Sequence, residues 1–386
     1  GNIFGIIVLA VDRMWVGHVG TESLAALGMA HSVLMICVNS ILGPAIGTLA
    51  GVSRAIGASE AARASRFFTQ GMLIGCLVGL ALCLAGLFIP GPVMAFMGSD
   101  AAVTEPAVNY LQISMMGLVI HAPLFVLTFG IQGTGDAKTA LKVQLVAPVV
   151  NAILDPLLIF GLDWGLQGAA WSTVLANGAA LALGVYYARR TPLRFVWGHS
   201  ALGFDLNVAK KVFSVGIPGT LEQLVRTFAL FLVLKILAPF GAVPLAAYTS
   251  MIMVVMLAVF PGLALGQATA TLVGQNLGAQ QFRRAWLTVW TSVGLYLAFM
   301  IMSGIGIYVW AEALVFVFDR NPEVVEEGAV LLRTMSFAFP TLAIAVILSK
   351  TFGGAGKTVP PMISSVIAHL FFQVIAASCW SQSHGL

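Results

Sequence analysis

Two polar residues one helical turn apart interrupt a long apolar stretch near the middle of the chain. Asn151 and Asp155 lie between Val143 and Gly161, and their spacing of four places both on one face of a helix. A carboxylate near the centre of a bilayer helix costs about 2.5–3.5 kcal/mol on insertion scales, so it usually faces a cavity, pairs, or binds an ion or proton. The pattern predicts a cation or proton site. The alternative is a carboxylate that only hydrogen-bonds to a neighbouring helix.

Prolines flank this pair. Pro148 and Pro156 have no N–H to donate to the residue four positions earlier, which predicts a bent helix with free carbonyl oxygens around Asp155. These oxygens would favour a bound cation.

Two further polar residues of the first half are candidates for the same site. Asp12 lies in the first apolar run, where it could act as a second carboxylate or pair locally with Arg13. Thr173 follows small residues that permit close helix approach, and its hydroxyl could complete an oxygen ligand set or bond its own backbone. If the ion is Na⁺, the predicted metal ligands are Asp12, Asn151, Asp155 and Thr173.

The second half of the chain carries a different polar inventory. Glu222 and Arg226 are four residues apart and can neutralise each other, which favours a structural pair. Together with Lys350 they form the alternative prediction, a polar site or substrate cavity in the second half. Lys350 and Lys235 could also extend to the membrane surface, and His369 could be merely hydrogen-bonded.

Composition identifies the elements that must position these groups. The 386 residues are 59% hydrophobic and 9% charged, against about a quarter charged in soluble domains, which excludes an ordinary soluble or disordered protein and predicts an all-α integral membrane protein. The charge of +4 is explained by membrane orientation, and no nucleic acid partner is implied. Eleven spans are predicted, at about Ile3–Val16, Leu24–Leu49, Phe68–Met97, Val108–Ile131, Leu141–Phe160, Leu166–Tyr187, Val212–Leu237, Leu245–Val273, Trp286–Val317, Val330–Thr351 and Pro361–Trp380.

The basic residues give the orientation. Lys and Arg concentrate in the connections after the even-numbered spans, which predicts that these connections and the N-terminus are cytoplasmic. The protein is therefore expected in the cell inner membrane as a multi-pass protein.

The two halves of the chain are repeats. The stretch Gly57 to Ala64 returns as Gly278 to Ala285, displaced by 221 residues, and Gly135…Lys138-Thr139 returns as Gly354…Lys357-Thr358, displaced by 219. Six spans separate the copies, so the repeats are parallel and related by a pseudo-two-fold axis along the membrane normal. This predicts two six-helix lobes with about twelve spans, of which the first and the last are truncated here. The predicted domains are residues 1–190, a basic cytoplasmic linker at 191–211, and residues 212–386.

The repeat also shows which polar residues are not duplicated. At these displacements the three acidic or amide candidates of the first lobe align with apolar residues: Asp12 with Val233, Asn151 with Leu370 and Asp155 with Val374. The asymmetry favours one ion-coupling site in the first lobe.

Enzyme motifs are not found. The sequence has no GxSxG, HExxH or paired His cluster, and Gly353 to Thr358 does not have the spacing of a phosphate-binding loop. No cofactor is predicted, and an ion gradient is the expected energy source.

Several short motifs occur in order across nearly the whole chain. They are Val11 to Gly20, Leu24 to Gly28, Gly133-Thr134-Gly135-Asp136, Asn151…Leu154-Asp155-Pro156, Gly168-Ala169-Ala170, Gly216-Ile217-Pro218 and Gly274 to Ala279. This order of motifs resembles the multidrug and toxic compound extrusion (MATE) family. The resemblance implies a monomeric twelve-span antiporter that exports cationic amphiphilic drugs in exchange for H⁺ or Na⁺ by alternating access. The alternative function is a lipid-linked oligosaccharide flippase of the same architecture, with basic residues lining its cleft.

Within that family the chain is most similar to the DinF-type and archaeal branch. The resemblance assigns the coupling role to Asp12, Asn151, Asp155 and Thr173. The chain differs from the NorM-type branch at Arg226, where that branch has an acidic residue. In this chain the acidic residue Glu222 lies one helical turn earlier.

Overall fold

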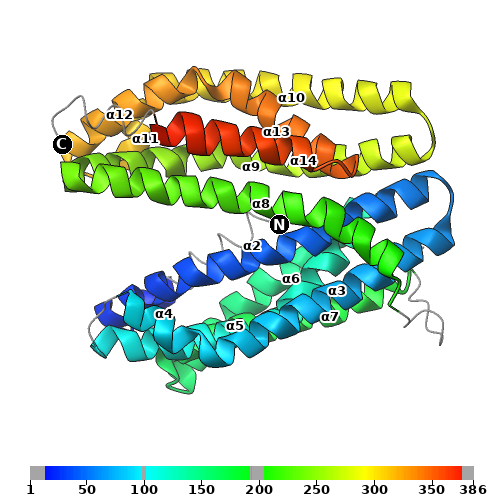
Figure 1. The fold of residues 1–386 in the computed structure, drawn as a ribbon. Coiled ribbons are helices and arrows are strands. Elements are labelled where there is room, and N and C mark those ends of the chain that lie inside the picture. Colours follow the sequence, from blue (N-terminus) through cyan, green and yellow to red (C-terminus); the bar gives the residue numbers. More distant parts are fainter. Residues whose placement is uncertain (1–13, 98–100, 192, 194–203, 376–386) are drawn as a thin grey trace. The chain divides into compact units, whose positions relative to one another are not determined.

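The apolar runs of the sequence form long helices, and every regular element in the part of the chain that the structure describes is helical (Figure 1). The computed structural model describes residues 14–97, 101–191, 193 and 204–375. It divides into two units, Gly1–Thr220 and Leu221–Leu386. The first unit contains α2 (Thr21–Gly57), α3 (Ala61–Phe88), α4 (Pro90–Phe96), α5 (Ala101–Gly133), α6 (Ala137–Pro156), the π-helical segment η1 (Leu157–Gly161), α7 (Gly165–Ala188) and the start of α8 (Leu206–Leu237).

The second unit continues α8 and adds a further series of helices. These are η2 (Ala238–Phe240), α9 (Ala242–Gly278), α10 (Phe282–Val309), α11 (Ala311–Phe316), α12 (Pro322–Ser336), α13 (Phe339–Gly354), α14 (Val359–Ser365) and η3 (Val366–Gln373). The proposed linker at 191–211 lies partly outside the described residues, and its last part is already helical because α8 begins at Leu206.

Membrane-spanning length is reached by most of the predicted spans. Among the described residues eight helices are long and apolar enough to cross a membrane, or nine if one bent pair counts as a span. The predicted first span, Ile3–Val16, lies largely outside the described residues. The predicted last span, Pro361–Trp380, is described only as far as η3 and the two residues that follow it.

The predicted tenth span, Val330–Thr351, is not one straight helix. It is divided between α12 and α13, whose axes differ by 62°. Pro340 stands at the second position of α13 and has no N–H to donate to the carbonyl of Ser336, the last residue of α12. The helix therefore breaks where the sequence analysis placed a continuous span.

Backbone geometry supports the internal repeat. Ser59 and Gln280 adopt left-handed conformations, with φ of 60° and 58°, at positions displaced by 221 residues. The predicted displacement of 219 for the match between Gly135 and Gly354 is wrong. The helices that precede it end at Gly133 and Gly354, and the following turns place Gly135 and Gly356 at positive φ, so here too the displacement is 221. The sequence alignment of the two halves was wrong by two residues at this point, because a short pattern of Gly and Lys matches in two registers.

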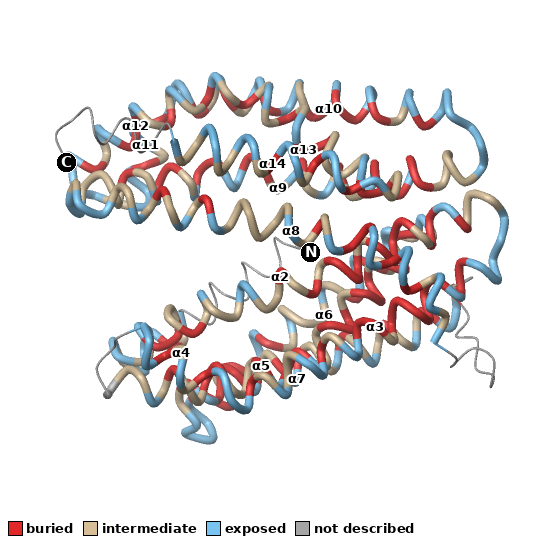
Figure 2. The backbone as a smooth tube through the Cα atoms, in the orientation of Figure 1, coloured by how far each residue is buried: buried red, intermediate tan, exposed pale blue. Residues whose placement is uncertain are grey.

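Each unit has its own apolar core. In the first unit α5 packs against α2, α3 and α7, and α6 packs against α7. In the second unit Tyr296 and Phe339 are fully buried between α9, α10 and α13. Figure 2 shows buried residues alternating with exposed ones along the helices. The exposed residues of α10 include Leu295 and Met302, 61% and 69% exposed, as suits a helix that faces lipid.

Candidate functional site

Four polar side chains from α6 and α7 form a hydrogen-bonded network inside the first unit. The Nδ2 atom of Asn151 donates to Asp155 Oδ1 at 3.1 Å, to Ser172 Oγ at 3.0 Å and to Thr173 Oγ1 at 3.2 Å. The hydroxyl of Ser172 donates to the same Asp155 Oδ1. Asn151, Asp155 and Ser172 are buried and Thr173 is half-buried. The structure thus brings together three residues that the sequence analysis selected.

The Ser172 hydroxyl has two acceptors for its single proton. Besides Asp155 Oδ1, the carbonyl oxygen of Ala169 lies 2.9 Å away. A charged Asp155 attracts the proton, whereas a protonated or ion-bound Asp155 accepts it less well, so the hydroxyl can turn to Ala169. The network can therefore adjust to a change of charge at Asp155 without moving a helix.

The local sequence determines where α6 begins and how it ends. Asp136 caps the start of α6 by accepting a hydrogen bond from the N–H of Thr139 at 3.0 Å. Hydrogen bonds from the Thr139 side chain and backbone hold the pKa of Asp136 below its ordinary value. After Pro156 the chain widens into the π-helical η1, which is the form that the predicted irregularity takes.

Gly168 sets the contact between α7 and η1. A Cβ atom at Gly168 would lie 2.7 Å from the carbonyl carbon of Leu158 and 2.9 Å from the backbone N of Ile159, so no larger side chain fits without a shift of backbone. Ser172 lies one turn after Gly168 on the same face of α7. The absence of a side chain at Gly168 therefore lets Ser172 approach Asp155.

The polar face of α7 extends one turn beyond Thr173. Asn177 hydrogen-bonds the ring of His121 on α5. The His121 ring also lies against Phe125 in a tilted arrangement, with 5.0 Å between ring centroids. The His121 Nε2 atom is buried and has no hydrogen-bond partner in the described chain. The sequence analysis did not identify His121, because the neighbour that it contacts is on another helix.

The second unit holds a separate charged cluster. Arg226 donates to Glu222 Oε1 at 3.1 Å, and the Ser349 hydroxyl of α13 donates to the same oxygen at 2.7 Å. Ser365 of α14 contacts the backbone carbonyl of Glu222 at 3.4 Å. Lys350 follows Ser349 and lies in electrostatic range of both Glu222 and Arg226. The predicted Glu222–Arg226 pair is present, and Ser349 is a partner that the sequence did not reveal.

The MatE family model matches residues 1–157 and 218–377, which include Asn151, Asp155 and the second-unit cluster but neither Ser172 nor Thr173. The chain belongs to the MatE family. Relatives include the probable multidrug resistance protein YpnP of Bacillus subtilis, 22% identical over 95% of this chain and 82% of that protein. The FAD transporter of Shewanella oneidensis is 26% identical with the same coverage. The probable multidrug resistance protein NorM of Thermotoga maritima is 23% identical over 95% of this chain and 80% of that protein.

Solved structures share the MatE fold. A MATE protein in the bent conformation superimposes with a TM-score of 0.90 at 23% identity, covering 96% of this chain and 83% of that chain. A MOP superfamily transporter from Pyrococcus furiosus, described as having a binding pocket of reverse polarity, gives a TM-score of 0.92 at 22% identity and covers 99% of this chain and 86% of that chain. The predicted family and the all-α two-lobe fold class are confirmed, and this MatE protein is a multi-pass transporter, not an enzyme.

Other predicted residues of this MatE protein contribute less to a site. Asp12 and Arg13 lie outside the described residues. Lys235 is exposed, and His369 Nδ1 lies 2.8 Å from Gln373 Oε1. No group of three or more His, Cys, Asp or Glu that could hold a metal occurs among the residues the structure describes. The described part of the first-unit network would offer a Na⁺ ion the Asp155 carboxylate together with amide and hydroxyl oxygens.

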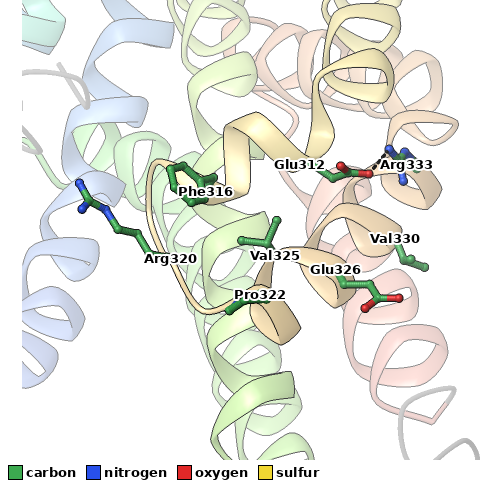
Figure 3. A pocket seen from close by; sticks show the side chains of 8 residues that line it. All are labelled: Glu312, Phe316, Arg320, Pro322, Val325, Glu326, Val330 and Arg333. Atoms are coloured by element: carbon green, nitrogen blue, oxygen red, sulfur yellow. Dashed lines mark hydrogen bonds and ion pairs between the residues drawn. The ribbon is translucent and has the colours of Figure 1, made fainter.

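A hollow of about 580 Å³ opens elsewhere on the second unit, between α11 and α12 (Figure 3). Its lining residues are Glu312, Phe316, Arg320, Pro322, Val325, Glu326, Val330 and Arg333. Arg333 pairs with Glu312 at 2.9 Å, and the two side chains are 37% and 65% exposed. Such a solvent-exposed ion pair contributes little to stability. None of the predicted site residues lines this hollow, which is a surface feature of the MatE protein.

Proposed function

We propose that this chain is a secondary active antiporter that exports small amphiphilic drugs in exchange for H⁺ or Na⁺ by alternating access. The observation that carries the proposal is the buried carboxylate of Asp155, held at hydrogen-bonding distance from Asn151 and Ser172. A buried carboxylate is costly unless its charge is compensated, and a transported ion provides that compensation for part of each cycle.

The steps at the site follow from the hydrogen bonds. In the charged state Asp155 accepts from Asn151 and from the Ser172 hydroxyl. Binding of H⁺ or Na⁺ neutralises the carboxylate, and the Ser172 hydroxyl turns toward the Ala169 carbonyl. Asn151 still donates to its other acceptors, Ser172 and Thr173. These hydrogen bonds keep α6 and α7 joined while the charge of Asp155 changes. We propose that Asp12 joins this site from the first span.

The relatives support drug export. Several are named as multidrug resistance proteins, and one as an FAD transporter. The family resemblance adds cationic amphiphiles as the substrates, an inner-membrane location with a cytoplasmic N-terminus, and a monomer. A lipid-linked oligosaccharide flippase is not favoured by these relatives.

The test is transport by the purified protein in liposomes. A fluorescent amphiphilic dye is loaded, and efflux is followed under an imposed proton gradient and, separately, under an imposed sodium gradient. We expect one of the two gradients to drive the dye against its own concentration gradient. If neither gradient does so, in liposomes where the protein is shown to be correctly inserted, the antiport proposal is wrong.

A further inference from the structure

The charged cluster of the second unit has an excess of positive charge. Glu222 and Arg226 lie near the middle of α8, and Lys350 approaches them from α13 beside Ser349. One carboxylate and two cations leave a net charge of +1 within apolar helices. An uncompensated charge in such surroundings is unfavourable, and the two cations repel each other.

Burial of the carboxylate distinguishes this cluster from a solvated surface pair. The Glu222 side chain is only 13% exposed, whereas the Arg226 side chain is 40% exposed with its Nε atom buried. Lys350 is half-buried, and its stem packs on Gly266 of α9: a Cβ atom at Gly266 would lie 2.7 Å from Lys350 Cγ. The backbone of α9 therefore restricts where the Lys350 side chain can go.

Hydrogen-bond donors remain in excess at the cluster. A guanidinium has five N–H donors and an ammonium three. Within the described chain, Arg226 uses one nitrogen for Glu222, its buried Nε has no partner, and the Lys350 ammonium has no hydrogen-bond acceptor. Glu222 Oε1 is already shared between Arg226 and Ser349. The cluster thus offers donors and positive charge without enough acceptors to satisfy them.

We propose that Arg226 and Lys350 bind one oxyanion, a carboxylate or a phosphate, carried by the exported amphiphile. The planar guanidinium suits two parallel hydrogen bonds to such a group, and the ammonium adds a point charge. Glu222 is the internal counter-ion that holds Arg226 when no substrate is bound, and the substrate's anionic group competes with it. This site rests on the proposed export function and specifies its substrates: amphiphiles with an acidic group are preferred to the same scaffold without it.

The test compares a rhodamine dye that has a free carboxylate with the methyl ester of the same dye, in proteoliposomes under the gradient that drives export. We expect the wild-type protein to show a KM for the free acid at least about tenfold below that for the ester, because hydrogen bonds to charged groups are worth about 1.5–3 kcal/mol. Arg226→Gln and Lys350→Gln should each remove most of this preference. Glu222→Gln, which removes the competing carboxylate, should lower the KM for the free acid.

Lys235→Gln is the matched control, since Lys235 is an exposed lysine on the same helix α8. We expect it to leave both KM values unchanged. Benzoate and phenyl phosphate, added as competitors, distinguish the two oxyanions: inhibition by either supports the site, and inhibition by neither contradicts it. Because Arg226→Gln could reduce folding, dye binding to detergent-purified Lys350→Gln, monitored by fluorescence anisotropy, gives an independent measurement.

The oxyanion site and the export function fail in different ways. If the wild-type protein exports both dyes with equal KM or prefers the ester, or if the Arg226 and Lys350 variants keep the preference, the oxyanion site is wrong while export stands. If neither dye responds to any gradient, the proposed export itself is wrong.

Discussion

Asp155→Asn isolates the charge of the first-unit network from its shape. The amide has the same size as the carboxylate and keeps an oxygen that can accept the bonds from Asn151 and Ser172. What it loses is the negative charge that binds H⁺ or Na⁺. We therefore expect the variant to fold with undiminished thermal stability, because a buried charge has been removed, and to lose coupling.

The size of the effect follows from the ion gradient. A chemical gradient of one ion equivalent to 100 mV supplies about 2.3 kcal/mol, which sustains a substrate concentration ratio of about 50-fold in a one-for-one exchange. Without an ion at Asp155 this free energy is not transmitted. The ratio at steady state should fall from about 50-fold toward unity, while downhill dye movement persists.

The assay measures the steady-state dye ratio across proteoliposome membranes, with the gradient imposed and then collapsed by an ionophore. Asp163→Asn is the control: Asp163 is exposed eight residues later and has φ of 56°, a conformation that asparagine also tolerates. It should retain the wild-type ratio. A wild-type ratio in Asp155→Asn would refute the coupling role of this carboxylate.

Three further predictions concern the supports of the network. Ser172→Ala removes a hydrogen bond that stabilises the charged carboxylate and that ion binding displaces, so the apparent affinity for the coupling ion should rise about tenfold or more, whereas Thr173→Val leaves the bonds to Asp155 in place and should change this affinity only a few-fold; the reverse order in ion titrations of efflux would contradict the geometry. Gly168→Ala should lower stability by about 1–3 kcal/mol in thermal unfolding, because its Cβ atom meets backbone, while Gly178→Ala on the same helix enters open space and should be neutral or slightly stabilising; equal shifts would argue against the contact. Asp136→Ala should cost about 1 kcal/mol at pH 7. The pKa of Asp136 is lowered in the folded state, so its stabilisation is present above the unfolded pKa and is lost as the pH falls through the folded one. A difference in Tm between wild type and variant that does not shrink in acid would show that the cap works without its charge.

The local part of the site could be predicted because it depends on helix geometry alone. Residues four apart share a face of any helix, so Asn151 with Asp155 and Glu222 with Arg226 were expected to contact, and both pairs do. The polar pair is also missing from the second half of the sequence at the corrected displacement of 221, where Asn151 aligns with Phe372 and Asp155 aligns with Ala376.

Contacts between helices could not be predicted in this way. Ser172 was passed over in favour of its neighbour Thr173, although Ser172 is the residue that bonds Asp155. Both hydroxyls accept from Asn151, but which of them reaches Asp155 depends on the rotation of α7, and that rotation is set by the close approach at Gly168. The link from Ser349 to Glu222 joins residues 127 positions apart and has no local signature.

The sequence by itself determined that the protein is a helical membrane transporter built from a repeat, since apolar length and the spacing of motifs are properties of the chain. It also determined which helix carries the buried acid. Only the tertiary structure decided which hydroxyls reach that acid, where the tenth span breaks, and that Ser349 and Lys350 of α13 approach the Glu222–Arg226 pair in the second unit. Those outcomes depend on side chains from separate helices meeting at distances of about 3 Å, the range of a hydrogen bond, and residue order alone does not fix distances of that size.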